Sequence, residues 1–168
     1  MDVAYINPII AATKEVLSTM VHVPVTPGKP HLYDTGARVD RLYQLSAVVG
    51  LKGPISGFAV LSVSRPTAEA LVKGLLGDVP SAQDELRAAC FDALGEVANM
   101  ICGSAKKNFP GGLVELSPPK LTETKTLNYP PNIPIIGIPF DAGVGRLSIT
   151  ISFRHVAAPT PEASAPAN

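Results

Sequence analysis

Residues 81–108 read SAQDELRAACFDALGEVANMICGSAKKN and form the clearest periodic segment of the chain. Apolar and small residues recur in it every three or four positions, the spacing of one face of an α-helix. They are Leu86, Cys90, Ala93, Leu94, Val97, Ile101 and Ala105. Ser81 opens an approximate capping box in which Asp84 replaces the usual Glu, and Pro110 and the two glycines after it end the pattern. The sequence therefore predicts one long helix over these residues.

A polar stripe follows the opposite side of this helix. Asp92, Glu96 and Asn99 are spaced i, i+4 and i+7, so at about 100° per residue they fall within roughly 60° of arc, and Gly103 shares their stripe. Because the apolar set faces the other way, these side chains should point outward. The ordinary explanation is the solvated face of an amphipathic helix. The alternative is a contact surface, since Asn and Gly are poor choices within a helix, where Gly costs up to about 1 kcal/mol relative to Ala.

The segments around the long helix predict an α+β domain. A helix should begin with Asn7 as N-cap and Pro8 at its first position and run to about Val21. The other expected elements are a β-hairpin within residues 41–63, a helix over 66–76 ended by Gly77, and strands over 113–116, 134–140 and 146–153. This order is typical of an antiparallel sheet packed against helices. We place the domain at residues 1–155 and predict a disordered, Ala- and Pro-rich tail over 156–168.

Composition excludes several classes of protein. The chain has 168 residues, 46% of them hydrophobic and 17% charged, which suits one domain with a sizeable core. Fourteen basic residues balance fourteen acidic ones, so no overall field favours nucleic acid or an anionic membrane as partner. No apolar run is long enough for a membrane span, and the acidic start is unlike a secretory signal. We therefore expect a cytoplasmic protein.

Cysteine and histidine give no metal or disulfide signature. Cys90 and Cys102 lie twelve residues apart in one helix, or about 18 Å at 1.5 Å per residue, which is beyond disulfide reach. Both are most simply small core residues. The three histidines are scattered (His22, His31 and His155), so we predict no metal site in this chain.

One short motif suggests a different enzyme. Residues 34–36, Asp-Thr-Gly, match the aspartic-protease signature, and residues 135–137 echo that family's second, apolar motif. Aspartic proteases are nearly all-β, whereas here the long predicted helix separates the two motifs. We therefore interpret Asp34 as a turn residue.

The segment LGEVANMICG at residues 94–103 resembles the CheX family of chemotaxis phosphatases, relatives of CheC and FliY. The family pattern is Asp or Ser, then Glu four residues on, Asn three further, and a proline later in the chain. Asp92, Glu96 and Asn99 match it, with Pro118 and Pro119 following. The likeness extends to residues 1–8, 49–57, 75–77 and 116–119. The motif occurs once, as in CheX, whereas CheC-type chains carry it twice.

The resemblance implies a phosphatase of two-component signalling. Its substrate would be the aspartyl phosphate of a CheY-like response-regulator receiver, which would also hold the Mg²⁺, so that this chain binds no cofactor. Asn99 would orient the attacking water and Glu96 would contact the receiver's conserved lysine, while Asp92 and Gly103 would contact the partner. The resemblance also implies a homodimer built by sheet association. Phosphoryl transfer needs positioning and charge stabilisation more than covalent chemistry, and an amide on a rigid helix suits that task.

Two alternatives remain at this stage. The chain can be a non-catalytic CheX-like module that docks a receiver or another signalling protein, with Glu96 supplying affinity through a charge pair. It can also be a structural dimerisation domain. A requirement for Asn99 in dephosphorylation distinguishes the phosphatase from both.

Overall fold

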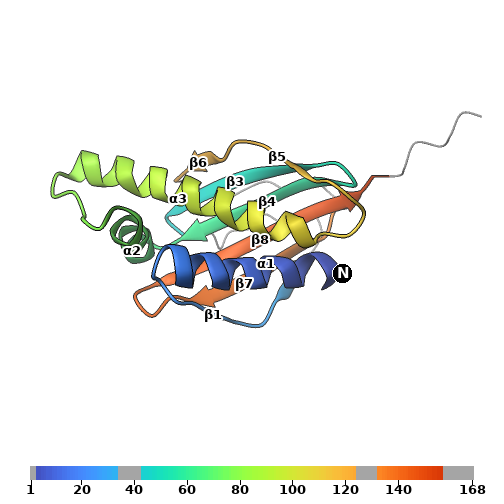
Figure 1. Cartoon of the computed structure of the whole chain (residues 1–168), viewed down its shortest axis with the longest axis horizontal. Helices are drawn as coiled ribbons and strands as arrows, with labels where there is room; N and C mark the ends of the chain where they lie inside the picture. The colour runs from blue at the N-terminus through green and yellow to red at the C-terminus, as the bar shows by residue number, and fades with distance from the viewer. Residues whose placement is uncertain (1–2, 34–42, 124–131, 157–168) are drawn as a thin grey trace, which may run out of the picture.

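The computed structural model describes residues 3–33, 43–123 and 132–156 (Figure 1). The helical elements are α1 (Val3–Glu15), the π-helix η1 (Val16–Met20), α2 (Arg65–Leu76), α3 (Gln83–Ala105) and the 3₁₀ turn η2 (Lys106–Asn108). The strands are β1 (Thr26–Pro27), β2 (His31–Tyr33), β3 (Leu45–Lys52), β4 (Ile55–Val63), β5 (Glu115–Leu116), β6 (Lys120–Thr122), β7 (Ile135–Asp141) and β8 (Arg146–His155).

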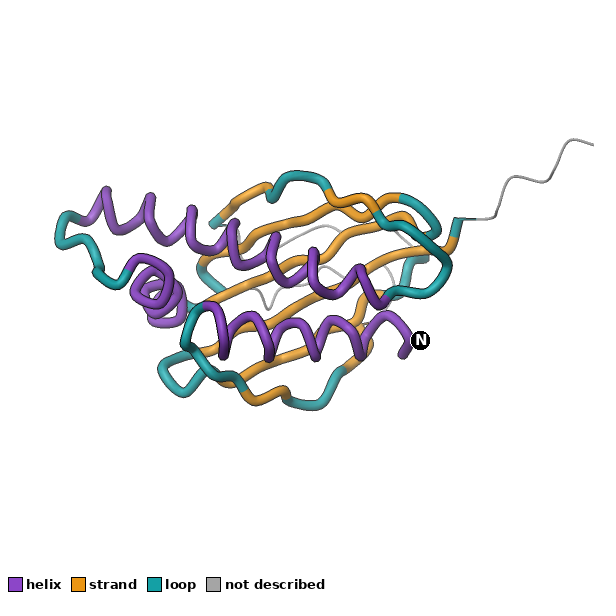
Figure 2. The backbone as a smooth tube through the Cα atoms, viewed as in Figure 1, coloured by secondary structure: helices purple, strands orange, loops and turns teal. Residues whose placement is uncertain are grey.

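The strands form one antiparallel sheet in the order β1-β7-β8-β4-β3-β5, with β2 also pairing with β7 and β6 with β3. Helices α1 and α3 lie side by side across one face of this sheet, and α2 packs against α3 near the end where α3 begins (Figures 1 and 2). The predicted α+β class, an antiparallel sheet packed against helices with one long helix, is confirmed. No helix within the described ranges is long and apolar enough to cross a membrane.

The core lies between the sheet and the two long helices. Leu94, Val97 and Ile101 of α3 are at most 2% exposed. Full burial of an aliphatic side chain of this size stabilises a fold by about 1.5–3 kcal/mol. Tyr5 of α1 packs against the rings of Phe109 and Phe153 at 5.1 and 4.8 Å, and its hydroxyl donates to the Pro110 carbonyl at 3.0 Å. The apolar face predicted for the long helix is therefore the face that holds α3 on the sheet.

Both cysteines are buried and neither is in a disulfide, which confirms their interpretation as core residues. Burial raises the pKa of both thiols, that of Cys102 to about 12. Gly77 ends α2 with φ of 79°, the left-handed conformation expected of a glycine in that position.

Two predicted helix starts are wrong. α1 begins at Val3, so Asn7 is not its N-cap and Pro8 lies inside the helix. Tyr5, in the turn before the proline, is only 2% exposed. Its burial stabilises that turn by more than is lost with the helix hydrogen bond that Pro8, which has no N–H, cannot donate. α3 begins at Gln83 with Ala82 as N-cap and no side-chain cap, so the capping box at Ser81 does not form. Asp84, in the first turn of α3, instead interacts favourably with the positive end of the helix dipole.

The strand predictions need smaller corrections. The strand expected over residues 113–116 forms only at Glu115–Leu116, and the short strands β1, β2 and β6 were not predicted. Val156, assigned to the tail, donates its N–H to the Pro54 carbonyl at 2.9 Å. The rest of the predicted tail, and Asp34 of the protease-like motif, lie outside the described residues.

Candidate functional site

The four residues predicted as a site lie together on the outward side of α3. Asp92, Glu96 and Asn99 are exposed and Gly103 is half-buried. At 1.5 Å per residue the stripe extends over about 16 Å of helix. Within the described ranges, the side chains of Asp92, Glu96 and Asn99 make no hydrogen bond or ion pair. They are therefore available to a partner, on a helix whose other face is fixed in the core.

A second segment supports α3 beside the motif. A Cβ on Gly95 would lie 3.5 Å from Leu121 Cδ2 and 4.0 Å from Pro119 Cβ, so residues 119–121 pack against the helix one position before Glu96. Ser117 holds this segment to β3, because its Oγ accepts from Gly50 N–H at 2.8 Å. Of the two prolines that follow the family motif in sequence, Pro119 thus lies next to the motif in space.

The far end of the same segment is fixed by an ion pair. Arg87 Nε and Nη2 donate to Glu123 Oε1 and Oε2 at 2.8 and 3.0 Å. The hydrogen bond from Arg87 lowers the pKa of the Glu123 carboxyl, and the same contact raises the pKa of the guanidinium. Residues 117–123 are therefore tied to β3 at one end and to α3 at the other.

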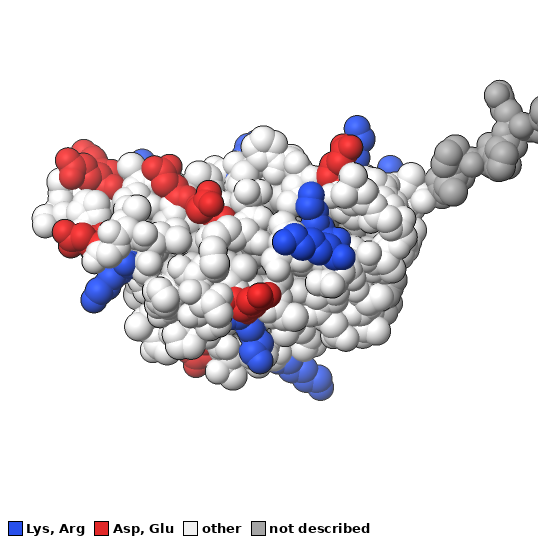
Figure 3. Space-filling model, viewed as in Figure 1, with Lys and Arg blue, Asp and Glu red and all other residues white. Residues whose placement is uncertain are grey.

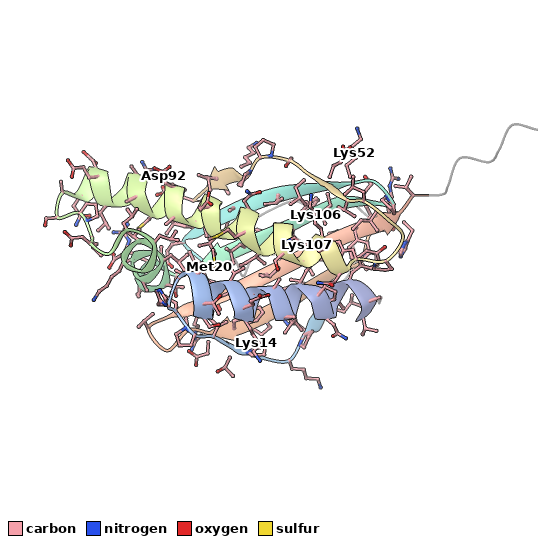
Figure 4. All side chains as sticks on the ribbon, viewed as in Figure 1. Lys14, Met20, Lys52, Asp92, Lys106 and Lys107 are labelled. Carbon is pink, nitrogen blue, oxygen red and sulfur yellow. The ribbon has the colours of Figure 1, made fainter. Side chains whose placement is uncertain are left out.

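Charge divides along α3. Figure 3 shows acidic side chains over its first half and basic ones at its far end. Figure 4 places Asp92 on the first half and Lys106 and Lys107 at the end. Asn99 and Gly103, both uncharged, lie between them in the sequence of the helix. A partner docked along the stripe therefore meets opposite charges at its two ends.

A groove that the sequence does not indicate adjoins the acidic half of α3. It has a volume of about 570 Å³ and lies between the end of α2 and the first half of α3. Its lining residues are Leu75, Leu76, Glu85, Ala88, Ala89, Asp92, Ala93 and Glu96. Leu76 is 66% exposed. No pattern in the sequence indicates the groove, because Leu75 and Leu76 continue the helical spacing of the buried Leu71 and Val72. We call this feature the α2–α3 groove.

The chemistry available on this face is that of a rigid amide and carboxylate. An amide side chain both donates and accepts, so Asn99 can hold a water molecule in a fixed orientation, and a carboxylate such as Glu96 can pair with a cation. In the described part of the chain, no three His, Cys, Asp or Glu side chains are grouped to hold a metal ion. Fold and site together define an α+β domain that exposes one polar face of its long helix.

The comparisons with known proteins give this domain its family. The model of the family "Chemotaxis phosphatase CheX" matches residues 45–141, and the chain belongs to this family. The family resemblance predicted from the sequence is thereby confirmed.

Similarity to known proteins extends over most of the chain. The CheY-P phosphatase CheX of Thermotoga maritima is 28% identical over 130 residues, which are 76% of this chain and 80% of that protein. The crystal structure of a chemotaxis protein CheX from Desulfovibrio desulfuricans is 30% identical and aligns with a TM-score of 0.76. The alignment covers 89% of this chain and 99% of that protein's chain. The CheX–CheY–BeF₃–Mg²⁺ complex from Borrelia burgdorferi has a TM-score of 0.71, covering 90% of this chain and 98% of its own, and at 22% identity it shows a shared fold.

Proposed function

We propose that this protein is a phosphatase that hydrolyses the aspartyl phosphate of a CheY-like response-regulator receiver. The observation that carries the proposal is the pair Glu96 and Asn99, exposed and unpaired among the described residues on the outward face of α3. The relative from Thermotoga maritima, named a CheY-P phosphatase, supports the same reaction. A solved relative from Borrelia burgdorferi in complex with CheY supports a receiver as the partner.

In the proposed reaction Asn99 holds a water molecule in line with the phosphorus atom. The water oxygen bonds to phosphorus while the bond from phosphorus to the receiver's aspartyl oxygen breaks, giving inorganic phosphate and a free carboxylate. Glu96 pairs with the receiver's lysine and fixes the docked orientation. Mg²⁺ held by the receiver, not by this chain, stabilises charge on the phosphoryl group. Because an acyl phosphate already has a good leaving group, positioning by α3 is the main requirement.

We extend the proposal to the setting in which the protein works. Asp92 and Gly103 contact the receiver on either side of the catalytic pair. The protein is a homodimer, as the CheX resemblance implies, and it works in the cytoplasm, as expected from the sequence.

The test is the decay of a phosphorylated receiver with and without this protein. The receiver is a CheY from the same organism, phosphorylated with acetyl phosphate. We expect faster decay with the wild-type protein and a loss of about 100-fold or more in kcat for Asn99→Ala, the usual size of a contribution from a positioned catalytic group. Asn108→Ala is the matched control, because Asn108 is also exposed but lies beyond the stripe on η2. Thermal melts of both variants should match the wild type, since neither side chain packs in the core.

The second candidate is a docking module without catalysis, which the α2–α3 groove favours. Receiver binding that is measurable in calorimetry, together with unchanged decay, would support this alternative. Glu96→Lys tests the contact in either case, because it places like charges opposite one another and should weaken binding. Unchanged affinity of this variant would remove Glu96 from the interface.

A further inference from the structure

The α2–α3 groove combines an apolar wall with charges of one sign. Two leucines at the end of α2 and three alanines of α3 form the apolar part, and Leu76 is 66% exposed. The charged residues lining it are Glu85, Asp92 and Glu96, all acidic. An exposed leucine gains stability when a partner removes it from water, and carboxylates around it attract cationic groups. The groove therefore suits an apolar side chain that is flanked by Lys or Arg.

The groove is continuous with the proposed catalytic stripe. Asp92 and Glu96 belong to both, because they line the groove and also lie on the stripe with Asn99. A protein seated against Glu96 and Asn99 therefore also reaches the groove. One partner, and not two, accounts for both surfaces.

We propose that the receiver domain fills this groove. A surface segment of the receiver inserts an apolar side chain beside Leu76, and basic residues next to that side chain face Glu85 and Asp92. The contact determines which receivers this protein binds. This inference rests on the proposed function, since it assigns the groove to the same partner.

The charge along α3 fixes the direction of docking. The acidic half around Asp92 attracts the basic segment of the receiver and repels its anionic phosphoryl group. Lys106 and Lys107, at the far end of the helix, have the opposite preference (Figure 4). The phosphoryl group is therefore held near Asn99, away from the groove, in a single orientation.

Leu76→Arg tests the groove, because it removes the apolar contact and adds a charge that repels a basic segment. The matched control is Leu113→Arg, at a leucine that is 76% exposed and does not line the groove. With the phosphorylated receiver as substrate, we expect Leu76→Arg to raise KM about thirtyfold or more, the loss typical of an interface hot spot, with kcat within about twofold. Leu113→Arg should leave both constants unchanged. Neither leucine is buried, so thermal melts should confirm that both variants fold.

A second pair of variants tests the charges. Glu85→Lys should weaken binding of the beryllofluoride- and Mg²⁺-loaded receiver in calorimetry and should reduce the dependence of affinity on salt. Glu115→Lys, the same change at another exposed glutamate, on β5, is the control and should leave affinity and salt dependence as in the wild type. Equal losses in the two variants would overturn the assignment of the basic segment to the groove.

Failure of this inference is distinct from failure of the proposed function. If the wild type accelerates decay, Asn99→Ala does not, and Leu76→Arg keeps the wild-type KM, the groove assignment is wrong and the phosphatase stands. If the wild type binds the receiver without accelerating decay, the phosphatase is wrong, and loss of binding by Leu76→Arg still supports the groove. Absence of any binding overturns both.

Discussion

Gly103→Ala should make the protein more stable and less active. Gly103 lies in the last turn of α3, and a Cβ built on it meets nothing within 4 Å. Alanine loses less backbone entropy than glycine on entering a helix, so we expect the free energy of unfolding to rise by about 0.5–1 kcal/mol. Outside the adjacent turns of α3, the added methyl group contacts none of the described residues, so no clash with them offsets this gain.

The same methyl group stands on the stripe that we assign to the receiver. If the receiver packs closely there, the methyl group overpacks the interface, which typically costs about 1–3 kcal/mol. Converted at 1.4 kcal/mol per tenfold, this corresponds to a rise in KM of about fivefold to a hundredfold. Higher stability combined with weaker receiver binding cannot arise from misfolding, so the pair of results isolates the contact.

Gly74→Ala is the matched control for the stability measurement. Gly74 lies in α2, where a Cβ would overlap the carbonyl oxygen of Val21 and lie 2.8 Å from Val21 Cγ1. The same helix-propensity gain applies, but the clash with backbone should lower the free energy of unfolding by about 1–3 kcal/mol net. Urea unfolding followed by circular dichroism measures both variants. If Gly103→Ala is no more stable than the wild type, the inference that a methyl group at this position meets no neighbour is wrong. If its KM is unchanged, Gly103 does not belong to the interface.

Three further predictions follow from the same structure. Because burial raises the Cys102 pKa to about 12, its thiolate fraction at pH 8 is on the order of 10⁻⁴, so iodoacetamide should alkylate it only after unfolding, as mass spectrometry can measure. Ser117→Ala removes the hydrogen bond with Gly50 N–H and should lower unfolding free energy by about 1 kcal/mol in urea melts; an unchanged value would mean that water replaces the hydroxyl. The Glu123 carboxyl has a lowered pKa, so its pairing with Arg87 is complete above the usual Glu range and is lost as pH falls through the lowered value. In NMR titrations Arg87→Gln should therefore raise the Glu123 pKa, and raised salt should weaken the pairing.

The long helix and its outward residues were predictable because their information is local. The period of the apolar residues fixes which side of α3 is buried, and the spacing of Asp92, Glu96 and Asn99 then fixes them as neighbours on the other side. Gly77 was predictable for a similar reason, since a left-handed residue at a helix end favours glycine whatever surrounds it. The outward placement of the proposed site residues could be predicted without knowledge of the sheet.

The features that could not be predicted depend on contacts between residues distant in sequence. Pro8 suits the first position of a helix by local rules, but burial of Tyr5 against Phe109 and Phe153 extends α1 beyond it. Strands of two or three residues such as β2 carry too short a pattern and exist because β7 offers a pairing edge. The α2–α3 groove combines residues of two helices, so no periodicity in either one indicates it.

The proposed site is divided between two helices, and this division separates the residues proposed for catalysis from those proposed to select the receiver. An aspartyl phosphate and a conserved lysine are features that receivers share, so in the roles proposed here Glu96 and Asn99 would discriminate little between one receiver and another. Selection then requires a contact with residues in which receivers differ, and the α2–α3 groove provides one. Its leucine wall belongs to the end of α2, whereas α3 also packs against α1, β3 and residues 119–121. We therefore expect substitutions of the exposed Leu76 to alter the choice of receiver while the proposed catalytic pair keeps its place.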